Sequence, residues 1–234
     1  MTPRFVHLHV HSEFSLRDST ARLPEKPEYG DPGKAPRPNL VSRAVELAQP
    51  ALALTDLNNL FGLVKFYRAA EKSGIKPIAG ADLLVTDEHG VARFTLLCRN
   101  RSGYLGLSRL ISRAYLEGHH GDHVAARAEW LHAEATGLIL LAGRESPVGK
   151  LAIEGHLDAA EHALRELQKH FGDRVYLELT RTGRKHEEEF NAAAIELASR
   201  CDLPLVASND VRFLGREDFD AHEARVCIAG GMTL

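Results

Sequence analysis

Apolar positions along the chain follow two alternating patterns, short unbroken runs and helical repeats. The runs "PALALTD" (50–56), "GLILLAG" (137–143) and "RVYLELT" (174–180) have the length of buried strands. Between them, stretches such as "HLDAAEHALRELQKHFG" (156–172) place apolar residues at helical spacing, with polar residues on the opposite face. Strands that alternate with helices in this way predict an α/β fold with a parallel sheet or a barrel.

The same patterns predict the remaining elements. Residues 20–39 carry five of the ten prolines, which is typical of a surface loop. A hairpin is predicted over 85–100, with its turn at His89-Gly90. The acidic run "HEEEF" (186–190) predicts the solvated first turn of a helix, where negative charge suits the helix dipole. We expect further strands at 4–10, 75–85 and 203–210, and further helices at 40–48, 59–74, 102–118, 127–134, 186–202 and 216–231.

Polar residues gather at the ends of the predicted strands. In α/β barrels and doubly wound sheets, catalytic and binding groups collect at the carboxyl ends of the strands. The residues that fall at such places in this chain are His9, His11, Asp56, Asp82, Glu178 and Asp210. We therefore expect a functional site assembled from segments that are far apart in the sequence.

The stretch "FVHLHVHSEFSLRDS" (5–19) suggests what kind of site this is. Alternate residues of a strand point to one face, so His7, His9 and His11 share a face if the strand is regular. Imidazoles combined with carboxylates suit zinc, manganese or iron, and neighbouring ions of this kind activate water against a phosphodiester. The carboxylates that could complete such a shell are Asp18, Asp82 and Asp210. From the spacing alone, these histidines could equally bind a metal, form buried hydrogen bonds or lie on the surface.

Composition limits the partners and the compartment. Apolar residues make up 44% and charged residues 26%, which predicts a globular core, and the net charge is −3. A protein that binds nucleic acid by itself carries a basic surplus, so contact with DNA would need a partner or further chain. Cys98, Cys201 and Cys227 form no CxxC pair, and "MTPRFVHLHV" has no signal-peptide core, so we expect reduced thiols in the cytoplasm. No apolar run reaches the length of a membrane span, and no membrane partner is expected.

Several motifs occur in order along nearly the whole chain: "HLHVHSEFSLRDS", "ALALTDLNNLFG", "GIKPIAGAD", "YLELTRTGR" and "VASNDVRFLGREDFDAHEARVCI". Together they resemble the amino-terminal PHP (polymerase and histidinol phosphatase) domain of bacterial replicative DNA polymerase III alpha subunits, above all the proteobacterial type. The resemblance implies an α/β fold, a distorted (β/α)7 barrel, over residues 1–234, with the proline-rich loop 20–39 as an insertion. The last residues, "GMTL", also favour a fragment of a longer polymerase chain.

In metal-bound members of that family nine ligands hold up to three ions, and the resemblance carries them over only in part. Residues of a suitable type stand at His9, His11, Asp18, Asp82 and Asp210, with Asp82 in place of a glutamate. Histidines of the family are replaced at Leu57, Thr182 and Arg212, and a cysteine is missing near Gly143 and Arg144. A fixed cation beside divalent ions is unfavourable, so we expect Arg212 to take a metal's place and pair with Asp210 or Asp82. The histidines of "EGHHGDH" (117–123) could be substitute ligands, although a solvated loop is the favoured interpretation.

The resemblance implies a structural role first. The domain would brace the rest of the polymerase chain, dock the proofreading exonuclease subunit and meet DNA only through the full holoenzyme. Its degraded site would hold no metal, or only residual zinc, manganese or magnesium. Nucleotidyl transfer in such chains belongs to carboxylates of a later region, so this fragment is not expected to polymerise DNA.

The alternative is an active metal-dependent phosphoesterase, for instance a 3′–5′ exonuclease. The retained His9, His11, Asp18 and Asp210 favour it, whereas Leu57 and Arg212 oppose it. A free-standing enzyme similar to histidinol phosphatase is a weaker third interpretation, because the ending "SNDVRFLGREDFDAHEARVCI" is of the polymerase type.

Overall fold

The computed structural model of the chain describes residues 5–25, 37–87, 90–121 and 123–233. It divides into two compact units. Unit 1 comprises Met1–Ala79 and Asp210–Leu234, and unit 2 comprises Gly80–Asn209.

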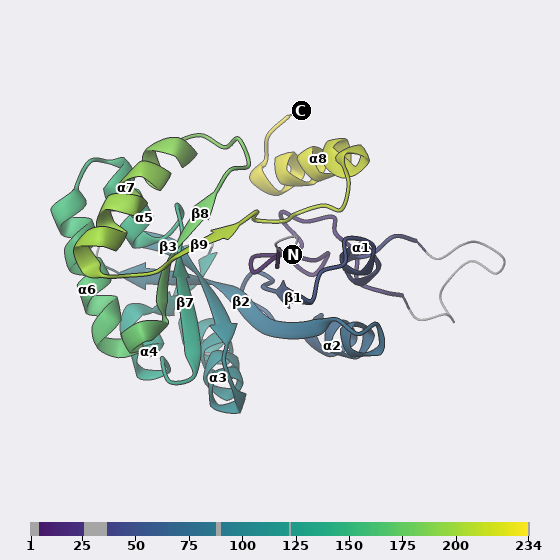
Figure 1. Cartoon of the computed structure of the whole chain (residues 1–234), viewed down its shortest axis with the longest axis horizontal. Coiled ribbons are helices and arrows are strands. Elements are labelled where there is room, and N and C mark those ends of the chain that lie inside the picture. The colour runs from purple at the N-terminus through teal and green to yellow at the C-terminus, as the bar shows by residue number, and fades with distance from the viewer. Residues whose placement is uncertain (1–4, 26–36, 88–89, 122, 234) are drawn as a thin grey trace. The chain divides into compact units, whose positions relative to one another are not determined.

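Figure 1 shows the helices and strands of both units. Those of unit 1 are α1 (Leu40–Glu46), β1 (Ala51–Leu54), α2 (Leu63–Lys72), the first four residues of β2 (Lys76–Asp87), the 3-10 helix η3 (Arg216–Asp218) and α8 (Phe219–Gly230). Those of unit 2 are the rest of β2, β3 (Gly90–Cys98), α3 (Arg101–Glu117), β4 (His119–His120), β5 (His123–Val124), β6 (Ala126–Arg127), α4 (Ala128–Ala133), β7 (Leu138–Ala142), α5 (Pro147–Ile153), α6 (Leu157–Phe171), the 3-10 helix η2 (Gly172–Arg174), β8 (Val175–Thr180), α7 (Glu187–Cys201) and β9 (Leu205–Ser208).

Unit 1 is built on the parallel pair of β1 with the start of β2. All four residues of β1 are buried, as a parallel strand covered on both faces requires. Asn39 caps α1 by accepting hydrogen bonds from the amides of Val41 and Ser42. Gly74 follows α2 with a φ of 72°, a left-handed conformation that ends the helix at little cost for glycine. The core of this unit includes Val10, Leu23, Val41, Leu52, Leu54, Leu63 and Phe66.

Unit 2 contains a mixed sheet. The predicted hairpin is confirmed, because β2 pairs antiparallel with β3 from Gly80–Leu97 to Asp87–Gly90, but Gly90 belongs to β3 and not to the turn as predicted; residues 88 and 89 lie outside the described residues. β3 is also antiparallel to β7, whereas β7, β8 and β9 run parallel to one another and β6 runs parallel to β2. The sheet is antiparallel at β3 because a tight hairpin reverses the chain, where a crossover helix would be needed to keep it parallel.

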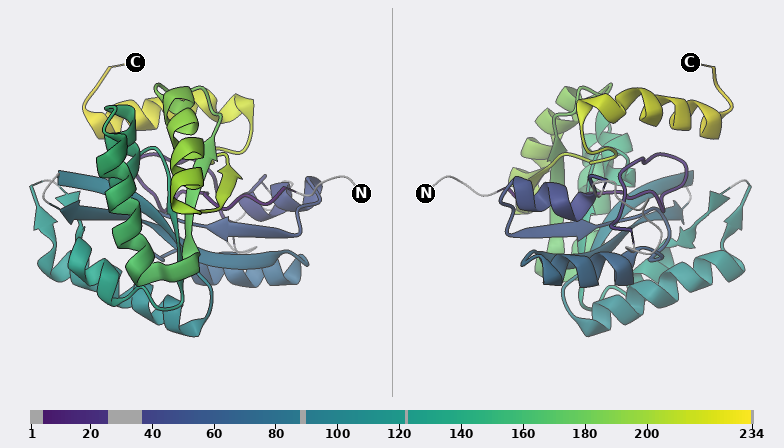
Figure 2. Two further views of the ribbon diagram at one scale, coloured as in Figure 1. Left: turned by 60° about the vertical axis from the view of Figure 1, so that its left-hand side comes forward. Right: turned by 90° about the vertical axis from the view of Figure 1, so that its right-hand side faces the viewer.

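Helices cover the strands of unit 2. α5, α6 and α7 pack on one another, and α7 packs on β8. Figure 2 shows α6 and α7 side by side along these strands. The sequence reading missed α5, a seven-residue helix that begins with the Ser146 cap and Pro147 at its first turn. The core of this unit includes Leu83, Leu96, Leu107, Leu138, Leu140, Leu164, Phe171, Leu177, Phe190 and Leu197.

Two loop predictions have separate outcomes. Of the proline-rich loop 20–39, residues 26–36 lie outside the described residues, while Ala21 and Leu23 before them are buried in unit 1. The histidines of 117–123 belong to the two-stranded hairpin β4–β5, in which His120 pairs with His123, and all three side chains are exposed. Their solvated position agrees with the favoured interpretation.

Candidate metal centre

The N-terminal segment of unit 1 is extended, but it is not the regular strand that its sequence predicts. It makes two isolated bridges, from His7 to Leu52 and from Val10 to Val211. The carbonyl of His7 accepts from the amide of Ala53, and the next acceptor for β1 is Val10, which bonds the amide of Thr55. A regular parallel ladder would use residue 9 there, so one extra residue is inserted between the two bonds.

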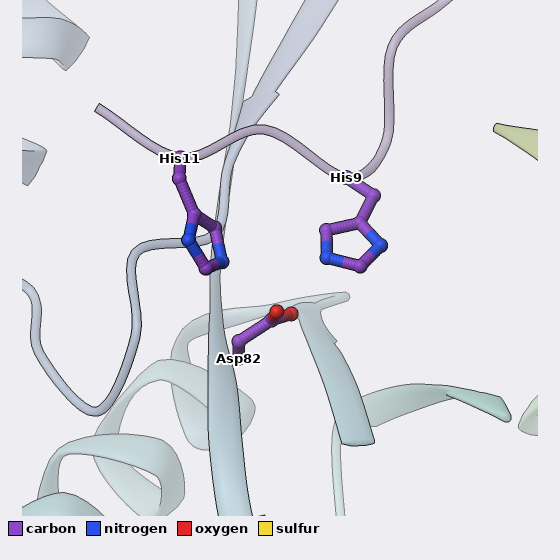
Figure 3. A group of neighbouring side chains, drawn as sticks. All are labelled: His9, His11 and Asp82. Carbon is purple, nitrogen blue, oxygen red and sulfur yellow. The ribbon is translucent and has the colours of Figure 1, made fainter. Parts of the chain in front are cut away.

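This insertion removes the regular alternation that a shared face for His7, His9 and His11 requires. His7 stacks edge-on against Phe5, at 4.9 Å between ring centroids, and burial lowers the pKa of its imidazole. The rings of His9 and His11 are both buried, with centroids 5.8 Å apart. One nitrogen of each lies within 4.8 Å of the other, a spacing from which a metal site can be built. Figure 3 shows the two rings projecting from the same segment; it also draws Asp82, which belongs to unit 2.

An ion-pair network joins the remaining predicted ligands of unit 1 to these histidines. His11 Nδ1 lies 2.9 Å from Asp18 Oδ1, and His9 Nε2 lies 3.1 Å from Asp210 Oδ1. The Arg212 guanidinium connects the two pairs: Nη1 lies 3.6 Å from Asp18 Oδ2, and Nη2 pairs with Asp210 Oδ1. The same Nη2 lies 3.5 Å from His9 Nε2. The predicted pair of Arg212 with Asp210 is thus present, and the guanidinium stands among residues predicted as metal ligands.

The backbone holds Arg212 in this position. Its carbonyl accepts hydrogen bonds from the Ser19 hydroxyl and the Thr20 amide, and Ser19 also donates to the carbonyl of His11. Asp210 adopts a φ of 46°, a left-handed conformation that few residues other than glycine take without cost. The side chain of Arg212 is only 2% exposed, so its charge depends on these carboxylates for compensation.

Asp56, the acidic residue of "TDLNN", organises the loop that follows His11. Its carboxylate accepts from the amide of Ser12 at 2.6 Å, the hydroxyl of Ser12 at 2.7 Å and the hydroxyl of Ser15 at 2.7 Å. Burial raises the pKa of Asp56, and these hydrogen bonds oppose the rise without cancelling it. Leu57, at a lost ligand position, gives its amide to the Ser15 hydroxyl. In this structure Asp56 therefore shapes a loop.

Asp82, considered within unit 2, is fully buried and has partners of its own. Thr95 Oγ1 donates to its Oδ1 at 2.6 Å, and Arg93 Nε lies 3.3 Å from its Oδ2. The sequence analysis did not predict Thr95 or Arg93 as partners of Asp82. The register that pairs Asp87 with Gly90 sets Thr95 directly opposite Asp82 and Arg93 on the diagonal, whereas a turn at His89-Gly90 gives a different register.

In unit 2, the two further positions at which the resemblance implies a lost ligand lie beside hydrogen-bonded side chains. Near the missing cysteine, a Cβ on Gly143 would stand 2.6 Å from Glu178 Oε2, and Glu178 accepts a bond from the Ser208 hydroxyl. At the other position, Thr182 Oγ1 donates to Glu187 Oε1 at 2.6 Å. Each of these two positions therefore lies beside a carboxylate that accepts a hydrogen bond from a hydroxyl, Glu178 from Ser208 and Glu187 from Thr182.

Glu187 corrects the expectation of a solvated acidic turn. It is 4% exposed and accepts from the hydroxyls of Thr180 and Thr182 and the amides of Thr182, Gly183 and Arg184. Burial alone would raise the pKa of this carboxyl, but the hydrogen bonds outweigh it and the pKa is lowered. The residue begins α7, where a negative charge is also favoured by the helix dipole. Sequence spacing could not separate it from the exposed Glu188 and Glu189 beside it.

The fold and these motifs define a member of the PHP domain family, and the chain belongs to it: the family model matches residues 7–182. Among solved structures, the chain is similar to an amidohydrolase from Chromobacterium violaceum with bound sulfate and no metal, at a TM-score of 0.58 and 16% identity over 94% of this chain and 96% of that one. It is also similar to a candidate metal-dependent phosphoesterase from Bifidobacterium adolescentis, at a TM-score of 0.56 and 14% identity over 97% and 96%. At these identities the likeness concerns the fold alone, and it confirms the predicted α/β barrel class.

The similar curated sequences are more specific. The chain is 57% identical to DNA polymerase III subunit alpha of Xylella fastidiosa, over 100% of this chain and 20% of that protein. It is 45% identical to DNA polymerase III subunit alpha of Escherichia coli, over 99% of this chain and 19% of that protein. The chain therefore spans about a fifth of the length of these relatives. Among the described residues, every helix is too short or too polar to cross a membrane.

Proposed function

We propose that this chain is the PHP region of a replicative DNA polymerase of the III alpha type, and that it serves there as a structural and docking domain without a working metal site. The proposal that residues 1–234 belong to such a polymerase is supported by similarity over the whole chain to a fifth of several subunits of that kind. Their polymerase activity would belong to the four fifths that this sequence does not include.

The observation that carries the structural role is the position of Arg212. Its guanidinium pairs with Asp18 and Asp210, two of the residues expected to bind metal, and lies 3.5 Å from the His9 nitrogen that a metal would need. A divalent ion added there would meet a buried positive charge at short range and would have to displace it from both carboxylates. The donor set as arranged therefore does not fit a metal, and no reaction step is assigned to one.

The network also offers a reason for the retained residues. His9, Asp18 and Asp210 keep the ligand type because each now has a partner within the network. Removing one member would leave a buried charge without compensation, which is costly. The retained histidines and aspartates are thus consistent with a structural role as well as with catalysis.

The partners we propose are the rest of the polymerase chain and the proofreading exonuclease subunit, with DNA reached only through the assembled holoenzyme. The net charge of −3 agrees with protein partners, because a domain that grips DNA by itself carries a basic surplus. A pull-down of the purified exonuclease subunit by the polymerase chain, with a control chain that lacks residues 1–234, tests this part directly.

The test of the metal-free site is the metal content of the purified, tag-free protein. We would dialyse it against trace zinc, manganese and magnesium and measure bound metal by mass spectrometry. We expect less than about a tenth of an equivalent, because Arg212 competes with any ion for the same carboxylates. A control protein with Arg43→Met, which removes an exposed arginine, should give the same value. One tightly held equivalent or more would overturn the proposal.

One observation favours the alternative of a metal-dependent phosphoesterase: the nitrogens of His9 and His11 still approach within 4.8 Å. If this alternative holds, the unaltered protein should hydrolyse a single-stranded DNA end in the presence of manganese, and His9→Ala should abolish the activity. If the structural role holds, hydrolysis should require at least Leu57→His together with Arg212→His, which return two histidines to the shell and remove the cation.

A further inference from the structure

Helix α8 of unit 1 carries both apolar and polar residues, and none of them is buried. On the inner face, Arg225 Nη1 donates to the carbonyl of Ser19 at 2.8 Å, and His222 packs against Phe213 at 5.2 Å between ring centroids. These contacts hold α8 against the segment that carries the histidines. Figure 2 (right) shows α8 at the edge of unit 1, on one side of that segment.

One side of α8 is apolar, although none of its side chains is buried. Ala221, Ala224 and Ile228 follow at spacings of three and four, so they form one stripe along the helix. Ile228 is 81% exposed, and Met232, just after the helix, is 58% exposed. Asp220 and Glu223 are exposed on another side of α8, so the stripe is a narrow apolar strip on a mixed helix, and such a strip normally packs on another element.

The helix end supplies a second observation. Gly231 has a φ of 66°, and the amide of Met232 donates to the carbonyl of Cys227 at 2.8 Å, so the helix stops in a left-handed turn. That turn changes the direction of the chain beside Ile228. The relatives continue well beyond this point, because the chain covers only 20% of their length.

We infer that the stripe of Ala221, Ala224 and Ile228 is a docking face for the part of the polymerase chain that follows residue 234. The inference rests on the proposal that this sequence belongs to a longer polymerase-type chain. The segment that docks there presents apolar side chains to Ile228. It packs closely against Ala221 and Ala224, whose small side chains let a second element approach the helix backbone. Covered in this way, the stripe is buried while Asp220 and Glu223 stay in water.

Cys227 provides a native probe for the test, because it precedes Ile228 and is half-buried. Cys201 is buried, and burial raises the pKa of the Cys98 thiol to about 12, so both react slowly with alkylating reagents. We would alkylate the full-length polymerase chain with iodoacetamide and identify the modified Cys227 peptide by mass spectrometry. Hydrogen exchange of the α8 amides would be followed in parallel.

Ile228→Lys should raise the rate of Cys227 alkylation about tenfold and speed the exchange of the last α8 amides by a similar factor, because the continuation is released from the face. Lysine suits the carboxyl end of a helix, so the variant does not weaken α8 itself. Ile195→Lys on α7 is the matched control: it also places lysine on an exposed helical isoleucine, and it should change neither readout more than about twofold. Ile228→Ala, which adds no charge, should give a smaller change in the same direction.

Equal rates in Ile228→Lys and Ile195→Lys would overturn the inference, since Ile228 would then be in water in the full chain. Protection that rises with protein concentration, with a doubled mass in light scattering, would also overturn it in favour of a second copy of the chain. Bound metal in the earlier measurement would contradict the proposed structural role without changing either readout of α8, so the two failures are distinguishable.

Discussion

Two groups of carboxylates, one in each unit, show two different ways of stabilising a negative charge away from bulk water. In unit 1, Asp18 and Asp210 are paired with a guanidinium from Arg212, which lies 194 residues along the chain from Asp18. In unit 2, Glu187 has hydroxyl and amide donors that all lie within seven residues of it. A long-range ion pair ties distant segments together, whereas local hydrogen bonds shape only one loop. We therefore expect disruption of the first to affect the whole unit and disruption of the second to stay local.

The comparison also shows that hydrogen bonds alone do not decide the protonation of a buried carboxyl. Asp56 in unit 1 accepts from one amide and two hydroxyls, and its pKa is raised because burial dominates. Glu187 in unit 2 accepts from three amides and two hydroxyls at the start of a helix, and its pKa is lowered. The stronger effect of burial at Asp56 and the larger number of hydrogen bonds to Glu187 separate the two cases.

The largest effect is expected for Arg212→Met, which keeps most of the side-chain volume and removes the charge. Asp18 and Asp210 would then lose their shared cation inside unit 1. Breaking a buried pair costs about 3–5 kcal/mol, and we expect the lower end because the side chain of Asp18 is 26% exposed and water can reach it. Urea unfolding followed by circular dichroism measures the free energy of unfolding.

Arg43→Met is the matched control for that experiment. Arg43 also pairs with a carboxylate, Glu46, but their side chains are 48% and 57% exposed, so the change should cost about 0.5 kcal/mol or less. If the two variants lose the same free energy, the Arg212 network contributes no more than a surface ion pair, and the contrast between the units disappears.

A smaller effect is expected for Glu187→Gln. The glutamine oxygen can still accept from the backbone amides of Thr182, Gly183 and Arg184, but the negative charge that these donors and the helix N-terminus stabilise is lost. We expect a loss of about 2 kcal/mol in the free energy of unfolding. Glu188→Gln, on the same helical turn with an exposed side chain, should leave the free energy within about 0.5 kcal/mol of the original. Hydrogen exchange should show faster opening at 180–187 and little change in unit 1, and a loss of protection in unit 1 would refute the local character of this bonding.

The pH dependence of Glu187 follows from its lowered pKa. A carboxyl with a lower pKa in the folded state stabilises the protein above its ordinary pKa of about 4.3 and loses that contribution as the pH falls through the folded value. The difference in stability between the original protein and Glu187→Gln should therefore be constant near pH 7 and shrink below about pH 4.3. Urea midpoints measured at several pH values test this. A difference that grew on acidification would mean that the pKa shift has the opposite sign.

The sequence predicted the element order because apolar periodicity depends on local spacing, and local spacing survives in the structure. It failed at the first strand, where one inserted residue between His7 and Val10 changes which side chains share a face. Residue patterns cannot show such an insertion, because it depends on which amides of β1 the segment meets. The Arg212–Asp210 pair was predictable from charge, whereas Arg93 and Thr95 beside Asp82 required the hairpin register. The burial of Glu187 could not be predicted, because Glu188 and Glu189 are the same residue type and are exposed.

The smallest effect is expected for Asp56→Asn, and its pH trend should run opposite to that of Glu187→Gln. The asparagine oxygen can accept from the Ser12 amide and the Ser15 hydroxyl, and its amide group can donate to the Ser12 hydroxyl, so the loop keeps its bonds. The raised pKa of Asp56 means that its contribution to stability is fully present below its ordinary pKa and is lost as the pH rises through the folded value.

At pH 7 the original protein carries the cost of a buried charge that asparagine lacks, so the variant should lose about 0.5 kcal/mol or less in the free energy of unfolding. Below the ordinary pKa of about 3.9 the original protein is relieved of that cost, and the loss should grow to about 1 kcal/mol. Urea titrations of both variants across this pH range test whether the two pKa values shift in opposite directions. Parallel trends would show that both shift in the same direction.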